Sequence, residues 1–143
     1  MPYRWIVYLH LASVLGFLAA HGVSMVVPWQ LRRQLDPAQA RFLLVLSVNT
    51  LGASYGFLGA ILVTGVLAGF AGGWWGRGWI WAALVLLIVM VGAMGALSRP
   101  YHEARRAAGV PSVRVAATHA IAITILGVGG LLVLLWLMLF KPF

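Results

Sequence analysis

The chain has 143 residues, of which 63% are hydrophobic and only 8% are charged, and its mean hydropathy is +1.00. Because an ordinary soluble domain carries about 25% charged residues, this composition predicts an integral membrane protein without a separate soluble domain. The net charge of +8 comes from basic residues at the ends of apolar segments. It therefore predicts contact with the headgroups of the lipid bilayer and no nucleic-acid partner. The lack of cysteine excludes disulfides and thiolate metal sites.

The first apolar segment, residues 5–29, contains no charged side chain and is long enough to cross a bilayer core of about 30 Å. It carries His10 and His21, which share one helix face and are separated by about 16 Å along the axis. Val14 and Phe17 lie between them on that face. Because imidazole is unfavourable against lipid, we expect this face to point into a helix bundle.

A helix start precedes the second apolar segment. Asp36, Pro37 and Gln39 occupy the N-cap, N1 and N3 positions of a pattern much like a capping box. The helix is predicted to begin there, at the membrane surface, and to cross the membrane over residues 42–70.

Glycines recur at four-residue spacing in this second segment. Two pairs lie on different faces of the helix: Gly52 with Gly56, and Gly65 with Gly69. Small residues at this spacing let helix backbones approach closely in lipid. We expect the pairs to pack within the monomer, and a homo-oligomer through these glycines is the alternative. Asn49, near the Gly52–Gly56 face, is expected to hydrogen-bond to a neighbouring helix.

Glycine and tryptophan dominate residues 72–79, which predicts a tight turn within an aromatic belt at one membrane surface. The third span is predicted over residues 80–97, ended by Pro100, with a short surface helix over residues 100–108. The fourth is predicted over residues 113–140, with His119 near its start.

The basic residues predict the orientation. One side of the membrane would hold seven of them, Arg32, Arg33, Arg41, Arg99, Arg105, Arg106 and Arg114; the other would hold Arg4, Arg77 and Lys141. The richer side is expected in the cytoplasm, with both termini outside. Short connections make neighbouring spans antiparallel, so the predicted fold is all-α, an integral membrane up-down four-helix bundle forming a single domain.

Histidines are the main candidates for chemistry. Apart from Arg114 at an edge, the spans lack charged groups, which argues against a carboxylate proton relay. Neutral imidazoles facing across a bundle suit haem b, and the estimated depths favour His21 and His119 as axial ligands. His10 lies at a depth similar to that of Met138 and is a candidate ligand of a second haem or of copper. Alternatively, these histidines hydrogen-bond to neighbouring helices through Ser47, Ser54, Thr64 or Asn49.

Three stretches carry a resemblance to a known family: YRWIVYLHLASVLGFLAAHGVSM, GGWWGRGWIW and RPYHEARR. Together they resemble a bacterial family of four-helix integral membrane proteins of about this length and of unknown function. That family is distantly similar to the membrane domain of copper-resistance protein D and to small haem-b four-helix proteins. The resemblance implies the bacterial cytoplasmic (inner) membrane, and b-type haem or copper handling, with His10 and His21 as candidate ligands. The methionine-rich extracellular segments expected of a copper importer are lacking.

Three functional hypotheses follow. The first is a haem-b protein in electron transfer with a membrane redox partner. The second is a non-catalytic accessory or assembly subunit of a larger complex, held by the Gly52–Gly56 face. The third is copper binding or transport, with these candidate ligands: His10, Met25, Met90 and Met94.

Overall fold

The computed structural model describes residues 2–31, 36–106 and 110–142. Within these ranges the side chains at 2, 28, 31, 37, 40, 41, 44, 48, 100–106 and 110–121 lie outside the description. Helices are the only regular secondary structure in the described part of the chain. It comprises α1 (Pro2–Leu31), α2 (Pro37–Gly72), the short 3₁₀ helix η1 (Trp74–Gly76), α3 (Gly78–Arg106) and α4 (Val110–Phe140).

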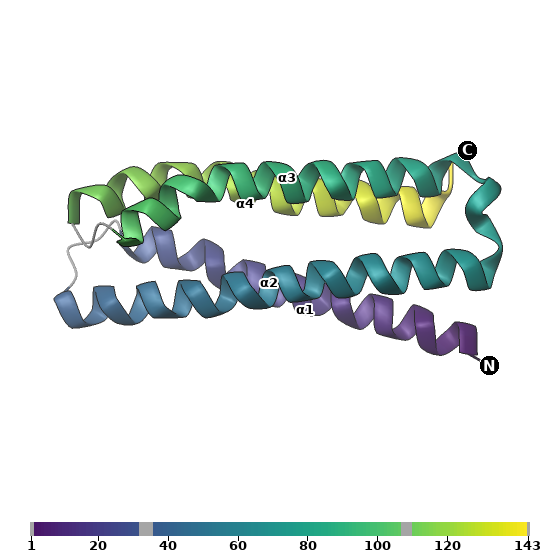
Figure 1. Ribbon diagram of the computed structural model, residues 1–143, viewed down its shortest axis with the longest axis horizontal. Helices are drawn as coiled ribbons and strands as arrows, with labels where there is room; N and C mark the ends of the chain where they lie inside the picture. Colours follow the sequence, from purple (N-terminus) through teal and green to yellow (C-terminus); the bar gives the residue numbers. More distant parts are fainter. Residues whose placement is uncertain (1, 32–35, 107–109, 143) are drawn as a thin grey trace.

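The four α-helices run alternately in opposite directions, so both termini and η1 lie at the same end of the molecule (Figure 1). Helix α1 packs mainly against α2, and α3 mainly against α4, which gives two helical hairpins. The hairpins meet chiefly where α1 contacts α4, whereas α2 and α3 contact each other little. The closest backbone approach of the two hairpins is therefore between α1 and α4.

The connection between the hairpins follows the predicted glycine-rich turn. Gly73 caps α2 in the left-handed conformation, with φ 66° and ψ 29°, and its N–H donates to the Phe70 carbonyl. A residue with a side chain is strained in this conformation, so glycine is the residue suited to end α2 here. Trp75 then packs beside Phe70 and Trp81, with ring centroids 5.0 and 5.4 Å away.

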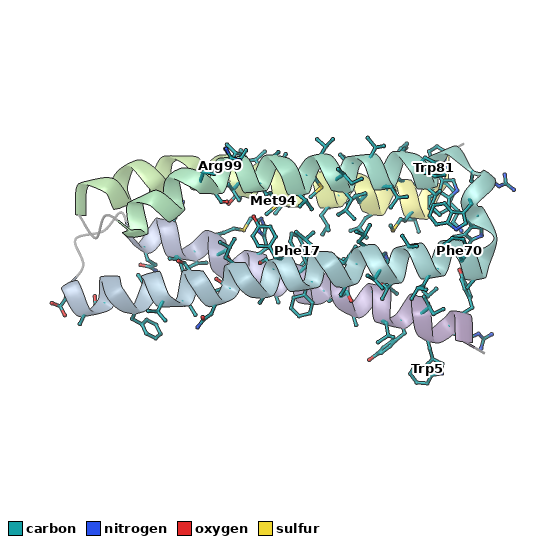
Figure 2. The ribbon with its side chains drawn as sticks, in the orientation of Figure 1. Trp5, Phe17, Phe70, Trp81, Met94 and Arg99 are labelled. Carbon is teal, nitrogen blue, oxygen red and sulfur yellow. The ribbon has the colours of Figure 1, made fainter. Side chains whose placement is uncertain are left out.

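The core lies between the hairpins. Phe17 of α1 and Met90 of α3 are almost completely buried, and they share one cluster with Leu58, Met94 and Leu134. Figure 2 shows Phe17 and Met94 between the hairpins, while Trp5 projects outward. The predicted inward face of α1 is thus confirmed, because His10, Val14, Phe17 and His21 are all buried.

Two details of the helix ends differ from the sequence predictions. Asp36 is the N-cap of α2 and is followed by proline, as expected, but its side chain makes no capping hydrogen bond. Helix α3 continues through Pro100 to Arg106, so the predicted helix break at Pro100 and the separate surface helix over 100–108 are wrong over the described residues. The apolar segment of α3, Gly78–Arg99, agrees with the span predicted over residues 80–97. A proline removes only one backbone donor, and its effect as a helix terminator is a tendency that the rest of a helix can override.

All four helices contain segments long and apolar enough to cross a membrane: Tyr3–Val27, Val45–Gly72, Gly78–Arg99 and Ala122–Phe140. Large apolar side chains such as Ile88, Ile125 and Leu139 point outward and are exposed. Soluble monomers rarely expose contiguous apolar surface on this scale, so the structure suggests a multi-pass membrane protein.

Candidate functional site

His10 is buried near one end of the bundle, where α1 crosses α2, and is only 8% exposed. Its Nδ1 lies 3.0 Å from the hydroxyl oxygen of Thr64. That hydroxyl donates its own hydrogen to the Ala60 carbonyl at 2.6 Å, so its oxygen is left to accept from the imidazole. The Ile61 carbonyl, 3.3 Å from the same hydroxyl, is a second acceptor for the hydroxyl hydrogen.

This arrangement assigns the proton of a neutral His10 to Nδ1 and leaves a lone pair on Nε2. A histidine held by its Nδ1–H in this way is oriented to accept a hydrogen bond or to ligate a metal through Nε2. The neighbouring Gly65 makes the contact possible, because a Cβ at that position would lie 3.2 Å from Cε1 of His10. The alternative prediction, that the histidines hydrogen-bond to a neighbouring helix, therefore holds for Nδ1 of His10, whose partner is Thr64.

His10 and Met138 line the same two cavities, in agreement with the similar depth expected from the sequence. The larger cavity has a volume of about 200 Å³ and the smaller about 50 Å³. Gly65 and Ile80 also line both. Soft sulfur and imidazole ligands together suit copper(I) or a haem iron, so the residue types keep both sequence predictions open.

His21 lies deeper in the bundle and is only 3% exposed. Its ring stacks on Phe17, with centroids 5.2 Å apart and planes inclined by 12°. No described residue forms a hydrogen bond with its Nε2, which is buried. Nε2 lies against the backbone of Gly127 in α4, in space that a side chain there would fill.

Three hydroxyl groups near this level, those of Ser24, Thr50 and Ser54, have partners other than His21. Ser24 donates to Thr50 at 3.0 Å, linking α1 to α2, and Thr50 in turn donates to the Leu46 carbonyl at 2.9 Å. Ser54 donates to the Thr50 carbonyl at 2.8 Å. The orphaned nitrogen of His21 therefore differs from His10, whose Nδ1 has a hydroxyl partner.

His119, the predicted second axial ligand, lies in α4, but its side chain is outside the described residues. It precedes Gly127 by eight residues, which corresponds to about 12 Å along a helix. The α4 residue in contact with His21 is therefore two turns from His119. Pairing of these two histidines stays a prediction.

The remaining candidate copper ligands are methionines. Within the described residues, no group of three or more His, Cys, Asp or Glu side chains could hold a metal ion. Met90 and Met94 are buried in the apolar core, and Met90 packs against Gly130. Met25 is half-buried on α1.

The two glycine pairs of α2 have different surroundings, so packing within the monomer holds for one pair only. Gly69 packs against Ile80 and Trp75, and Gly65 against His10. A Cβ on Gly52 or Gly56, by contrast, would meet no described atom within 4 Å. For this second pair the prediction of packing within the monomer is wrong over the described residues, because its face of α2 points away from α1 and from the α3–α4 hairpin.

Asn49, on the same side of α2, is also exposed, and no described residue forms a hydrogen bond with its side chain. The hydrogen bond to a neighbouring helix that the sequence led us to expect is thus not formed within the described monomer.

Comparison with known proteins gave no match. No protein-family model matches the chain, and no significant match was found among curated proteins or among solved structures.

Proposed function

We propose that this protein is a multi-pass, up-down four-helix protein of the bacterial cytoplasmic membrane that binds haem b and takes part in electron transfer. His21 is the principal axial ligand in this proposal. The observation that carries it is the buried Nε2 of His21, which has no hydrogen-bond partner.

An unpaired nitrogen in an apolar core is unfavourable by about 1–3 kcal/mol, because it has lost its hydrogen bonds to water. A ligand that accepts the Nε2 lone pair removes this penalty. Haem iron takes axial imidazole, and helix bundles commonly build such sites from inward-facing side chains. The donor chemistry of His21 therefore fits haem.

The surroundings of His21 hold its ring in one orientation. Phe17 stacks on the ring. Nε2 lies against the backbone of Gly127, and the ring fills the space that a side chain there would take. Because His21 lines neither of the cavities described above, binding of a haem at Nε2 requires α4 to move away from α1 at Gly127.

When bound, haem b supplies one-electron redox chemistry. The polypeptide would contribute the imidazole that holds the iron, the aromatic contact that orients this imidazole, and an apolar wall that excludes water. Arg99, exposed on α3, is a candidate partner for a propionate from the cytoplasmic side, and His119 remains the candidate second ligand. The orientation with both termini outside follows from the distribution of basic residues.

The test is the absorption spectrum of the detergent-purified protein, oxidised and then reduced with dithionite. We expect sharp α and β bands after reduction, with stoichiometric haem. The variant His21→Leu should lose these bands and His102→Leu should keep them, because the sequence places His102 outside the spans. Haem bands that survive unchanged in His21→Leu would refute the assignment of this ligand.

The exposed Gly52–Gly56 face favours a second candidate function, that of an accessory subunit of a larger membrane complex. This face is apolar, carries Asn49, and packs against no part of the described chain. Replacing Gly52 or Gly56 by leucine should then abolish co-purification of partners while leaving the monomer folded. Gly92→Leu is the matched control, since a side chain at Gly92 would also meet no described atom within 4 Å.

A further inference from the structure

The larger of the two cavities lined by His10 lies at the end of the bundle that holds both termini and the tryptophan-rich turn (Figure 1). Its wall is assembled from all four α-helices and η1, and is mostly apolar: Leu11, Gly65, Trp79, Ile80 and Met138 are examples. Its volume is about 200 Å³. A cavity of about 150 Å³ in a protein core is enough to hold a benzene ring. The space is therefore suited to a substituted six-membered ring.

Two polar atoms beside this space have unused hydrogen-bonding capacity. Nε2 of His10 carries a lone pair, because Nδ1–H is engaged with Thr64. Nε1–H of Trp75 is buried and has no partner among the described residues. Both residues line the adjoining cavity of about 50 Å³, where Gly65 and Met138 also form part of the wall. The acceptor thus lines the ring-sized space, and the donor lines the smaller cavity that adjoins it.

The cavity reaches two kinds of surface. Lys141, which is exposed, lies in its wall at the aqueous end, with its ammonium 4.3 Å from the centroid of Trp74. Leu11, which also lines it, is exposed on the apolar flank of α1. A ligand with a polar ring and an apolar tail could therefore leave its tail in the lipid.

We infer that this cavity binds the headgroup of a membrane quinol. One quinol hydroxyl donates to Nε2 of His10, and a ring oxygen accepts from the ammonium of Lys141 or, where the headgroup reaches into the smaller cavity, from Nε1–H of Trp75. The flat ring lies among the aromatic and small side chains of the wall. This site goes beyond the haem proposal and does not depend on it, since it shares no residue with the His21 site.

A copper ion is the main competing occupant, because His10 and Met138 are both possible ligands. Charge argues against it. The only charged side chain among the described wall residues is Lys141, whose ammonium repels a cation. The remaining wall residues are almost all apolar, which suits an organic ring better than a metal ion.

The experiment uses the full chain in lipid nanodiscs and, as the probe, tetramethyl-hydroquinone, which has no tail and is kept reduced under anaerobic conditions. Binding is measured by equilibrium dialysis as the uptake above that of empty nanodiscs. We expect saturable, stoichiometric binding to the wild type. His10→Leu and Trp75→Phe should each weaken it about tenfold, because each removes one hydrogen bond to the ring. Trp136→Phe is the matched control, since this exposed indole on α4 lies outside the cavity wall, and it should stay within about twofold of wild type.

Elution volume and thermal unfolding establish whether each variant is folded. If His10→Leu misfolds, Trp75→Phe still tests the site, because phenylalanine keeps an aromatic ring at residue 75. Uptake that is non-saturable, or equal in the folded variants and the wild type, would overturn the inference. So would an absence of quinol binding combined with stoichiometric copper binding that both His10→Leu and Met138→Leu abolish. The haem spectrum of His10→Leu separates the two proposals, because loss of quinol binding with intact haem bands affects only this site.

Discussion

Replacing Gly127 by alanine tests the contact between α1 and α4 on which the His21 site depends. A Cβ at this position would lie 2.8 Å from Cε1 and 3.0 Å from Cδ2 of His21, and still closer to Nε2. Carbon atoms in contact normally stand about 3.5–4.0 Å apart, so the ring has to move by about 0.5–1 Å. Because Phe17 stacks on the ring within a packed core, we expect a steric penalty of about 1–3 kcal/mol.

Gly129→Ala supplies the reference, since a Cβ there would meet no described atom within 4 Å. Both changes gain about 1 kcal/mol from the higher helix propensity of alanine, and this gain cancels in the comparison. The free energy of unfolding, measured by titration with a denaturing detergent, should therefore be about 1–3 kcal/mol lower for Gly127→Ala than for Gly129→Ala. The variant Gly127→Ala should also bind less haem. Equal stability of the two variants would show that His21 does not lie against Gly127.

Three further predictions concern single contacts. Thr64→Val keeps the side-chain volume but removes the acceptor for Nδ1–H of His10. The free energy of unfolding in detergent should therefore fall by about 1 kcal/mol, whereas the same change in a His10→Leu background should have little effect. Asp36→Ala should lower thermal stability by less than about 0.5 kcal/mol, below the typical N-cap effect of about 1 kcal/mol, because its side chain forms no capping bond; a full capping loss would contradict this. Lys141→Ala should remove a cation–π contact with Trp74 worth about 0.5–1 kcal/mol, detectable as a small shift in thermal unfolding that Lys141→Arg largely restores.

The sequence was sufficient to predict the four membrane-length apolar helices, the approximate bounds of their apolar segments and the buried face of α1. These features depend on properties that one segment carries by itself, namely apolar length, turn residues and the helical spacing of His10, Phe17 and His21. The turn at Gly73 is predictable for the same reason, since the residue that can adopt a positive φ stands between two apolar helices.

Contacts between helices were less predictable. In a membrane protein, the side of a helix that faces lipid is as apolar as the side that faces its neighbours, so hydrophobicity does not reveal how each helix is rotated. The sequence therefore could not separate Gly65, which packs on His10, from Gly56, which faces outward. It also gave no sign that Gly127 lies opposite His21, because that contact depends on the relative shift of α1 and α4 along their axes.

Pro100 was misjudged for a different reason. A proline followed by charged residues usually marks a helix end, but the loss of one backbone hydrogen bond is small compared with the bonds that the rest of a long helix retains. Trp75 was recognised only as part of an aromatic belt. Its unpaired Nε1–H is a property of its position between α2 and α3, which composition does not encode.

The most direct test of the account is the spectrum of the wild-type protein beside that of His21→Leu, both purified from haem-replete cells and reduced with dithionite. The account predicts α and β bands of a six-coordinate haem in the wild type and their loss in His21→Leu, with His102→Leu unchanged. A featureless visible spectrum of the wild type, not restored by added haemin, would contradict the haem proposal and leave His21 as an unliganded residue of the core.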